Sequence, residues 1–386
     1  MSAIVDKTDS RSECYSESTS SSNSRYALYL FSNNKHASTS DIISKEQDHV
    51  NNSKPDCDEP SVCLSLLEGN LDAEQETVVR CYLLKTLSGR EDLSFENEGK
   101  YAVLQFSDDS DQSFGCYYHR LSKNAPAADE NTSDIITSPK VYTFFICLIG
   151  PANGAMESFC PELGIFCQGL LHSLDPEGSK DQAHVQFRLK SWYFYCIEYV
   201  GRCIQRFKED ISLVLHCSLW GNVEIVSEDE NIKWDLERFV ETASLMPRIP
   251  DKAKEESSSL QSVLTVKISD VKIETSKPIA PSFYCSRWYD KLKNCHESDH
   301  IGMHNILEGF RLKAIQDLNT LKRLLQKAET DHYSLYRAYQ FLKASGYDDV
   351  LLHHVKREVT VTGEEEVLEI IACLQDFIKN KKSGPN

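Results

Sequence analysis

The chain has 386 residues, of which 40% are hydrophobic, and carries a formal net charge of −17. That length and hydrophobic content are enough for two or three domains with packed cores, so global disorder is excluded. An acidic surface repels the phosphate backbone, which argues against a nucleic-acid partner. The longest apolar run, residues 141–149, is far below the roughly 20 residues of a membrane helix, so any membrane association is expected to be peripheral.

The cysteines point to the redox compartment. There are fourteen of them, and they lie in apolar segments such as Val62-Cys63-Leu64. The N-terminus lacks the apolar region of a secretory signal peptide. We therefore expect free, buried thiols in a cytoplasmic protein, where the environment is reducing.

The N-terminal half predicts an α+β domain. Residues 1–24 are rich in Ser and acidic residues and predict a disordered tail. Residues 141–149 are apolar on both faces, which predicts a central strand. Four further strands are predicted at 26–31, 62–67, 101–106 and 114–121. Helices are predicted at 71–87, ending before Gly89, and at 155–174 and 185–219. The resulting order of strand, strand, helix, three strands, helix, helix resembles a longin domain, a fold that recurs among trafficking proteins.

The C-terminal half reads as mainly helical. Ser227 and Glu230 predict a capping box that opens a short helix, which stops before Pro247. A linker rich in breakers follows at 247–260, and an isolated strand is predicted at 263–273. Helices are predicted at 306–328, 333–343 (ending near Gly346) and 367–378. The predicted fold class is α+β. The chain is expected to consist of a disordered tail (1–24), a longin-like mixed α/β domain (25–180), long helices (181–246), a linker with the isolated strand (247–300) and a helical C-terminal region (301–380).

One string matches a zinc-peptidase motif. His296-Glu297-Ser298-Asp299-His300 reads H-E-x-x-H, in which His296 and His300 on one helical face would bind Zn²⁺ and Glu297 would act as the base. His304 adds a further potential ligand. The pattern arises by chance in roughly three of every hundred such chains, and its neighbours are polar. A solvated loop or helix start is therefore the favoured interpretation, and a zinc-dependent hydrolase is the alternative.

No other catalytic or cofactor motif stands out, since the chain has no G-x-S-x-G elbow, no Walker A string and no G-x-G-x-x-G. Cys167, His216 and Cys217 lie on apolar helical stretches, which favours packing over nucleophilic roles. We therefore predict no enzyme activity, no catalytic residues and no cofactor.

Two features of the C-terminal helices could serve a partner. The helix at 306–328 is locally basic and could contact an acidic partner or an anionic membrane, although a solvated face of a bundle explains it more simply. The next helix carries an aromatic series that fits either an interface or a core, with core preferred. The candidate partner-binding residues are Arg311, Lys313, Lys322, Arg323, Lys327, Tyr333 and Tyr336.

The same helices resemble a known family. Residues 310–325 (FRLKAIQDLNTLKRLL) and 331–343 (DHYSLYRAYQFLK) are similar to the C-terminal region of the Njmu-R family. Shorter matches include Ser191-Trp192, Ile204-Gln205-Arg206 and Ala243-Ser244-Leu245. The resemblance covers most of the chain from Tyr26 onward and departs from the family in the N-terminal tail and at 247–305, where the His-rich string lies.

The resemblance implies a non-catalytic adaptor in intracellular protein transport. The implied partners are a large WD-repeat subunit and a further complex subunit, with a TBC-domain adaptor and golgins acting indirectly. Together they would capture adaptor-derived, endosome-to-Golgi vesicles, which places the protein on cytoplasmic vesicles and the trans-Golgi network. A role in spermatogenesis is also implied. A true longin fold would add the possibility of small-GTPase binding, which nucleotide-dependent binding would reveal.

Overall fold

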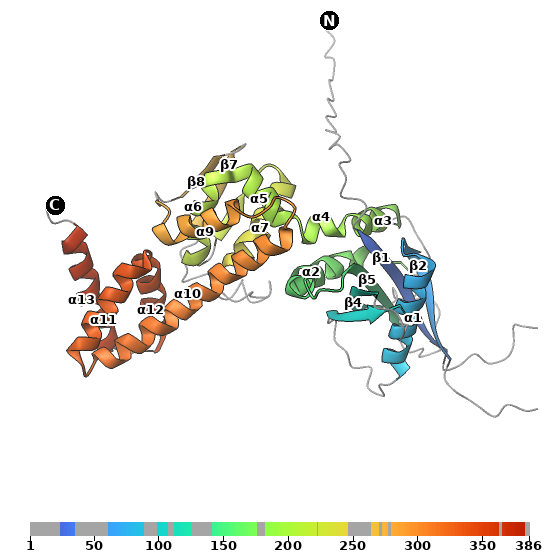
Figure 1. Ribbon diagram of the computed structural model, residues 1–386, viewed down its shortest axis with the longest axis horizontal. Coiled ribbons are helices and arrows are strands. Elements are labelled where there is room, and N and C mark those ends of the chain that lie inside the picture. Colours follow the sequence, from blue (N-terminus) through green and yellow to red (C-terminus); the bar gives the residue numbers. More distant parts are fainter. Residues whose placement is uncertain are drawn as a thin grey trace, which may run out of the picture. The chain divides into compact units, whose positions relative to one another are not determined.

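The structure is a computed structural model that divides the chain into two compact units, Met1–Cys196 (unit 1) and Ile197–Asn386 (unit 2). Each unit is described by itself (Figure 1). Residues 1–23 of the predicted tail and the predicted 247–260 linker lie outside the described residues, which are 24–34, 61–88, 99–106, 112–124, 141–175, 182–221, 223–245, 264–269, 272–276, 279–362 and 365–382.

Unit 1 is built on a five-stranded antiparallel sheet with strand order β2-β1-β5-β4-β3. The central position predicted for residues 141–149 is confirmed, because β5 pairs with β1 on one side and β4 on the other. Seven consecutive buried residues in β5 explain why its sequence is apolar on both faces. The strands are β1 Arg25–Asn34, β2 Ser61–Gly69, β3 Gly99–Gln105, β4 Ser113–Asn124 and β5 Val141–Pro151.

Helices cover both faces of this sheet. Helix α1 (Ala73–Ser88) places Val79 and Leu83 against one face, in a core shared with Tyr29, Phe145 and other alternate strand residues. The opposite face packs against α2 (Cys160–Leu170), which contacts β3 and β4, and against α3 (Gln182–Lys190), which contacts β1. Short 3₁₀ turns flank α2. The predicted order of strand, strand, helix, three strands, helix, helix is confirmed.

The single long helix predicted at 185–219 is wrong. The segment forms α3, α4 (Trp192–Cys196), α5 (Tyr199–Phe207) and α6 (Ile211–Trp220), with a 3₁₀ turn before α6. Lys208 ends α5 with a left-handed φ of 47°, a conformation that stops a helix. Apolar residues keep near-helical spacing across the breaks because each short helix buries one side, so periodicity alone could not reveal the breaks. Unit 1 extends through α4, beyond the boundary at residue 180.

Unit 2 contains a small three-stranded sheet, so the isolated strand predicted at 263–273 is wrong. Strand β7 (Leu264–Ser269) forms an antiparallel pair with β8 (Lys272–Thr275) and a parallel pair with β6 (Val223–Val226). The alternating pattern came from two strands of a hairpin, and their partner β6 lies far away in the sequence. Helix α7 (Glu230–Ala243) follows β6 and, as predicted, stops before Pro247.

The predicted capping box at Ser227 is also corrected. The N-cap of α7 is Asp229, whose carboxylate accepts hydrogen bonds from the backbone N–H of Asn231 at 2.9 Å and of Ile232 at 3.3 Å. The hydroxyl of Ser227 accepts from the backbone N–H of Asp229 at 3.2 Å. Asp is as good an N-cap as Ser, and the helix starts from Asp229, two residues later than the predicted cap.

The rest of unit 2 is helical, which confirms the α+β fold class. The predicted end of α11 is confirmed at Gly346, whose φ of 77° closes the helix. Helix α9 lies in the region 247–300 that was predicted to be a linker with an isolated strand, so it was not predicted, although its Ser282 N-cap is a helix start signal. Among the described residues, no helix has the length and hydropathy that a membrane span needs. The helices are α9 Phe283–Lys293, α10 His300–Ala328, α11 His332–Ser345, α12 Asp348–Thr362 and α13 Glu365–Lys382.

Candidate functional site in the α10–α11 hairpin

The H-E-x-x-H string does not lie on one helix. Residues 296–298 lie in the turn before α10, and Asp299 is the N-cap, accepting from the backbone N–H of Gly302 at 2.8 Å. His296 is exposed and its Nδ1 lies 2.8 Å from the Ser298 hydroxyl. His296 and His300 therefore do not share a helical turn, and the string is the helix start that its polar neighbours favoured.

The other two histidines of the zinc hypothesis pack within unit 2. His300 lies against Gly201 of α5, where an added Cβ would come within 2.9 Å of its Nδ1. Burial lowers the pKa of His300. His304 is buried, with its ring edge-on to Tyr199 at a centroid distance of 6.5 Å. In the parts of the chain that the structure describes, no three His, Cys, Asp or Glu residues are grouped so as to hold a metal ion.

A buried cysteine and histidine meet between α6 and α9. The Cys285 sulfur lies 4.0 Å from His216 Nδ1, and a thiol beside an imidazole is the arrangement of a cysteine nucleophile. Burial, however, raises the pKa of Cys285 to about 12 and lowers the pKa of His216, so the pair is a neutral thiol and a neutral imidazole. Trp220 Nε1 donates to His216 Nε2 at 2.9 Å, which fixes the ring. The pair is therefore part of the core.

Several other thiols are also buried in the core, while some are exposed. Burial raises the pKa of Cys217 to about 12, and Cys167 is fully buried with a raised pKa. The packing roles predicted for them are confirmed. Cys63, Cys81 and Cys373 are exposed, so the expectation that the cysteines are buried holds for only part of the set.

A tight turn joins α10 to α11. The carbonyl of Lys327 accepts from the backbone N–H of Thr330 at 3.3 Å and of Asp331 at 3.0 Å. Asp331 then caps α11, accepting from the backbone N–H of Tyr333 at 2.9 Å and from the Ser334 hydroxyl at 2.8 Å. The hydrogen bond from Ser334 lowers the pKa of Asp331. The two helices are thus held as an antiparallel hairpin.

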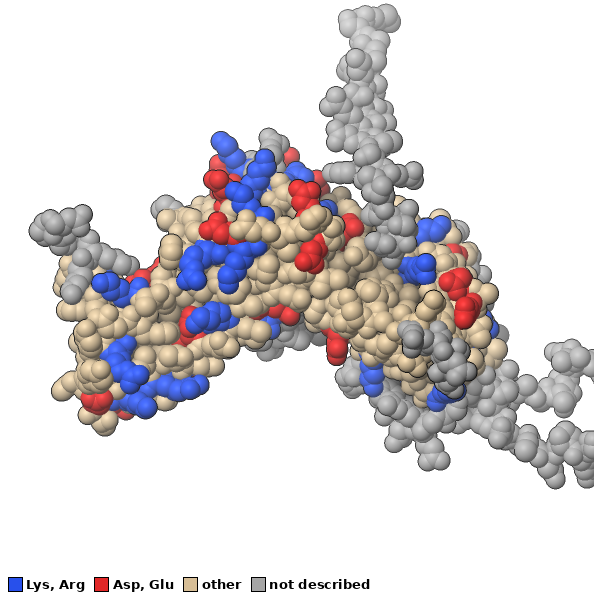
Figure 2. Space-filling view, viewed as in Figure 1, with Lys and Arg blue, Asp and Glu red and all other residues tan. Residues whose placement is uncertain are grey.

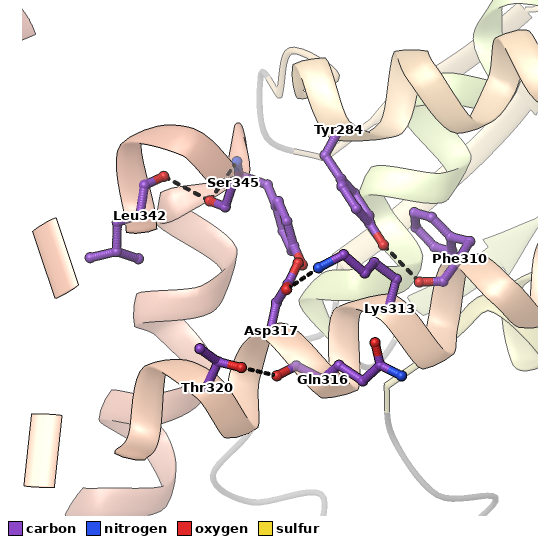
Figure 3. A network of polar contacts seen from close by, with 9 residues as sticks. Tyr284, Phe310, Lys313, Gln316, Asp317, Thr320, Leu342 and Ser345 are labelled. Atoms are coloured by element: carbon purple, nitrogen blue, oxygen red, sulfur yellow. Dashed lines mark hydrogen bonds and ion pairs between the residues drawn. The ribbon is translucent and has the colours of Figure 1, made fainter. Parts of the chain in front are cut away.

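A buried carboxylate fixes the hairpin to its neighbours (Figure 3). Asp317 of α10 accepts from the Tyr347 hydroxyl at 2.8 Å and forms an ion pair with Lys313. The Tyr347 ring stacks on Tyr284 of α9, with centroids 4.0 Å apart, and the Tyr284 hydroxyl donates to the carbonyl of Phe310 at 2.8 Å. Burial raises the pKa of both tyrosines. The network links α9, α10 and the start of α12.

Sequence reasoning did not find this network, although α10 carried a sign of it. Asp317 lies between Ala314 and Leu321 on the buried face of the helix. A lone carboxylate on an apolar stripe needs partners to offset its desolvation. Its partner Tyr347 lies beyond Gly346, outside any predicted helix.

Removing the Tyr347 hydroxyl tests how much the network contributes to the stability of unit 2. Tyr347→Phe is expected to lower the free energy of unfolding by about 2 kcal/mol, because the buried Asp317 carboxylate loses a hydrogen-bond donor. Tyr336→Phe removes an exposed hydroxyl and should change that free energy by less than about 0.5 kcal/mol. Urea unfolding followed by circular dichroism compares the two variants. Equal effects would mean that the network adds nothing to stability.

The five predicted cations differ in their surroundings. Lys313 pairs with Asp317, and Lys322 pairs with Glu358 of α12, so both stabilise contacts inside unit 2. Arg323 and Lys327 are exposed, and no described residue forms an ion pair with either. The remaining predicted cation, Arg311, is partly buried. Arg323 and Lys327 are therefore the two predicted cations that are both exposed and without an ion pair to a described residue.

The aromatic series also divides. Tyr333 and Tyr336 leave 66% and 56% of their surface exposed, whereas Tyr339 is 7% exposed and packs against Phe377 of α13. The preferred core interpretation therefore fails for Tyr333 and Tyr336. Gln340 Nε2 donates to the Tyr336 hydroxyl at 2.8 Å and orients its ring.

These residues form one candidate surface at the turn of the hairpin. Figure 2 shows Lys and Arg side chains gathered over α10 and α11 on the face in view. Arg337, which follows Tyr336, is exposed and was not among the predicted candidates. We call this surface the hairpin face, and it consists of Arg323, Lys327, Tyr333, Tyr336 and Arg337.

Comparison with known proteins assigns the chain to a family. No solved structure matches it. Protein Njmu-R1 of Mus musculus is 30% identical over 368 residues, an alignment that covers 92% of this chain and 90% of the mouse protein. The sequence model of the Njmu-R1-like protein family matches residues 26–380, which span both units and the whole hairpin. The chain therefore belongs to the Njmu-R1-like protein family.

Proposed function

We propose that this chain is a non-catalytic adaptor subunit that binds its complex through the hairpin face. The observation that carries the proposal is the exposure of Tyr333 and Tyr336, at 66% and 56%, beside cations that no described residue neutralises. Tyr and Arg are enriched where proteins bind one another, because each joins apolar area to a polar group. Family membership supports the same role through the Njmu-R resemblance.

The proposed partners are those that the resemblance implies. A large WD-repeat subunit and a further subunit would form the complex, and a TBC-domain adaptor and golgins would act with it. The proposed task is capture of adaptor-derived vesicles at the trans-Golgi network, with the protein associating peripherally with the membrane. A role in spermatogenesis is also proposed. Binding by a rigid helical surface fits this task, because tethering requires positioned contacts and no bond chemistry.

The test purifies the full-length tagged chain from cells and identifies its stoichiometric partners by mass spectrometry. Tyr333→Ala combined with Tyr336→Ala is expected to lower affinity for the WD-repeat subunit about thirtyfold, since loss of a central aromatic anchor costs about 2 kcal/mol or more. Tyr333→Phe combined with Tyr336→Phe keeps both rings and should retain most of the binding. Deleting the whole hairpin is a poorer test, because α10 contributes Phe310 and Leu321 to the core.

The purified protein also distinguishes the adaptor from the alternative, a zinc-dependent hydrolase. A preparation without a WD-repeat subunit would overturn the proposal. One tightly held zinc per chain, with hydrolase activity lost in Glu297→Gln, would instead establish the zinc-dependent hydrolase. Zinc analysis of the purified wild-type protein therefore belongs in the first experiment.

A further inference from the structure

The hairpin carries the opposite charge to the rest of the chain. Residues 300–345 contain seven Lys and Arg against four Asp and Glu, a net charge of +3 in a chain of −17. Two of the four acids are already engaged, because Asp317 is buried in its network and Asp331 caps α11. Two of the seven cations are engaged as well, since Lys313 pairs with Asp317 and Lys322 pairs with Glu358 of α12. Five cations and two acids remain, so the hairpin keeps its excess of three positive charges.

The free cations lie on the same two helices as the turn and the exposed tyrosines. Arg323 and Lys327 lie one helical turn apart on α10, and Arg337 lies one helical turn after Tyr333 on α11. The turn brings the two helices together there, since the Asp331 N–H donates to the Lys327 carbonyl at 3.0 Å, two residues before Tyr333. No described residue forms an ion pair with any of these three cations.

The tyrosines are held in place without a partner. Their ring centroids are 6.5 Å apart with an interplanar angle of 32°, and Gln340 fixes the hydroxyl of Tyr336. A side chain that is already ordered loses less entropy when a partner binds. The hairpin face therefore presents two oriented rings, with three free cations on the same two helices.

We propose that the hairpin face binds an acidic segment of a partner subunit, in which carboxylates meet Arg323, Lys327 and Arg337 and an apolar side chain packs on the rings of Tyr333 and Tyr336. This rests on the proposed function and specifies the chemistry of its partner. The charge complementarity is local, so it selects a segment and orients it.

An anionic membrane fits the same face less well. Stable attraction to such a membrane takes a cluster of about four to eight Lys and Arg, and two of the cations on α10, Lys313 and Lys322, are already paired inside unit 2. The hairpin face offers three free cations, Arg323, Lys327 and Arg337, which is fewer than such a cluster needs.

The first test identifies what touches the face. A photo-crosslinking benzoylphenylalanine replaces Tyr336 in the tagged full-length chain, and the crosslinked peptides are sequenced after irradiation in cells. The expected product is an acidic segment of a stoichiometric partner, and rising salt should weaken the complex. A crosslink to a neutral or basic segment would overturn the inference, as would a complex that survives without any crosslink at this position.

The second test separates local charge from net charge. Arg323→Glu, Lys327→Glu and Arg337→Glu together are expected to weaken partner binding about a hundredfold. The control variant carries Lys267→Glu, Lys272→Glu and Lys356→Glu, which change the net charge equally at exposed sites of unit 2 outside the hairpin, and should bind nearly normally. Equal losses in both variants would show that only total charge matters and would overturn the inference.

The two proposals fail in distinguishable ways. If replacing the tyrosines by Ala abolishes the complex and the hairpin charge reversal leaves it intact, the adaptor function stands and the acidic segment is excluded. If the charge reversal instead abolishes flotation with vesicles of phosphatidylcholine and phosphatidylserine and spares the complex, the face binds membrane. If wild-type protein recovers no WD-repeat subunit, the adaptor function itself is overturned.

Discussion

Replacing Trp192 by alanine (Trp192→Ala) is expected to lower the free energy of unfolding of unit 1 by about 3 to 5 kcal/mol, the usual cost of removing a buried Trp. Trp192 is fully buried, and its Nε1 donates to the backbone carbonyl of Arg25 in β1 at 3.2 Å. Just before it, Gln186 of α3 donates to the Glu68 carboxylate of β2 at 2.8 Å. These contacts make α3 and α4 part of the sheet's own fold.

Hydrogen exchange with mass spectrometry measures this effect in each unit of the full-length chain. In Trp192→Ala, protection should fall in β1 and β5, while the α10–α11 hairpin keeps its protection. The matched control is Phe187→Ala, which removes an aromatic ring that is 60% exposed on α3 and should change stability by less than about 0.5 kcal/mol. Unchanged protection in β1 would show that α4 does not stabilise unit 1.

Elements whose structure depends mainly on their own residues could be predicted from the sequence. Strand β5 was predictable as central because a strand that is buried on both faces has a continuous apolar run, and α11 was predictable to its end because Gly346 takes a left-handed φ. Breaks such as Lys208 were invisible, since a non-glycine residue with positive φ has no strong sequence signature. The pairing of β6 with β7 joins segments separated by a long stretch of chain, which local patterns do not encode.

The candidate site was only partly predictable for a related reason. Arg323, Lys327, Tyr333 and Tyr336 were all identified from the sequence, but exposure decides which residues are available. Tyr336 and Tyr339 lie three apart on one helix, so spacing alone places them on the same side, and the packing of α13 buries only Tyr339. Tertiary neighbours likewise pair Lys322 with Glu358 of α12.

A histidine buried in unit 1 makes its stability depend on pH. His119 of β4 is 1% exposed, and its Nδ1 lies 3.0 Å from the Tyr117 hydroxyl. Gly99 of β3 leaves room for the pair, because a Cβ there would lie 1.7 Å from the Tyr117 hydroxyl oxygen. No described residue offers a hydrogen bond to His119 Nε2, so a proton added there would be buried without an acceptor. Burial accordingly lowers the pKa of His119 from 6.5 to about 4.

The sign of the pH effect follows from that shift. Between pH 6.5 and about 4 the unfolded chain binds a proton at His119 that the folded chain does not bind, so unfolding becomes easier as the pH falls. At pH 4 the loss relative to neutral pH is expected to be about 3 kcal/mol from this residue. His119→Gln should remove that part of the pH dependence, whatever its effect on stability at neutral pH.

Urea unfolding from pH 7 to pH 4 isolates the contribution as the difference in slope between the wild type and His119→Gln. His184→Gln is the matched control, because His184 is exposed on α3 of the same unit and its replacement should leave the slope unchanged. Carboxylates that titrate in this range affect all three proteins equally and cancel in the comparison. Parallel curves for the wild type and His119→Gln would mean that His119 gains a proton as readily in the folded chain as in the unfolded one, which would require water or a rearranged Tyr117 to reach Nε2.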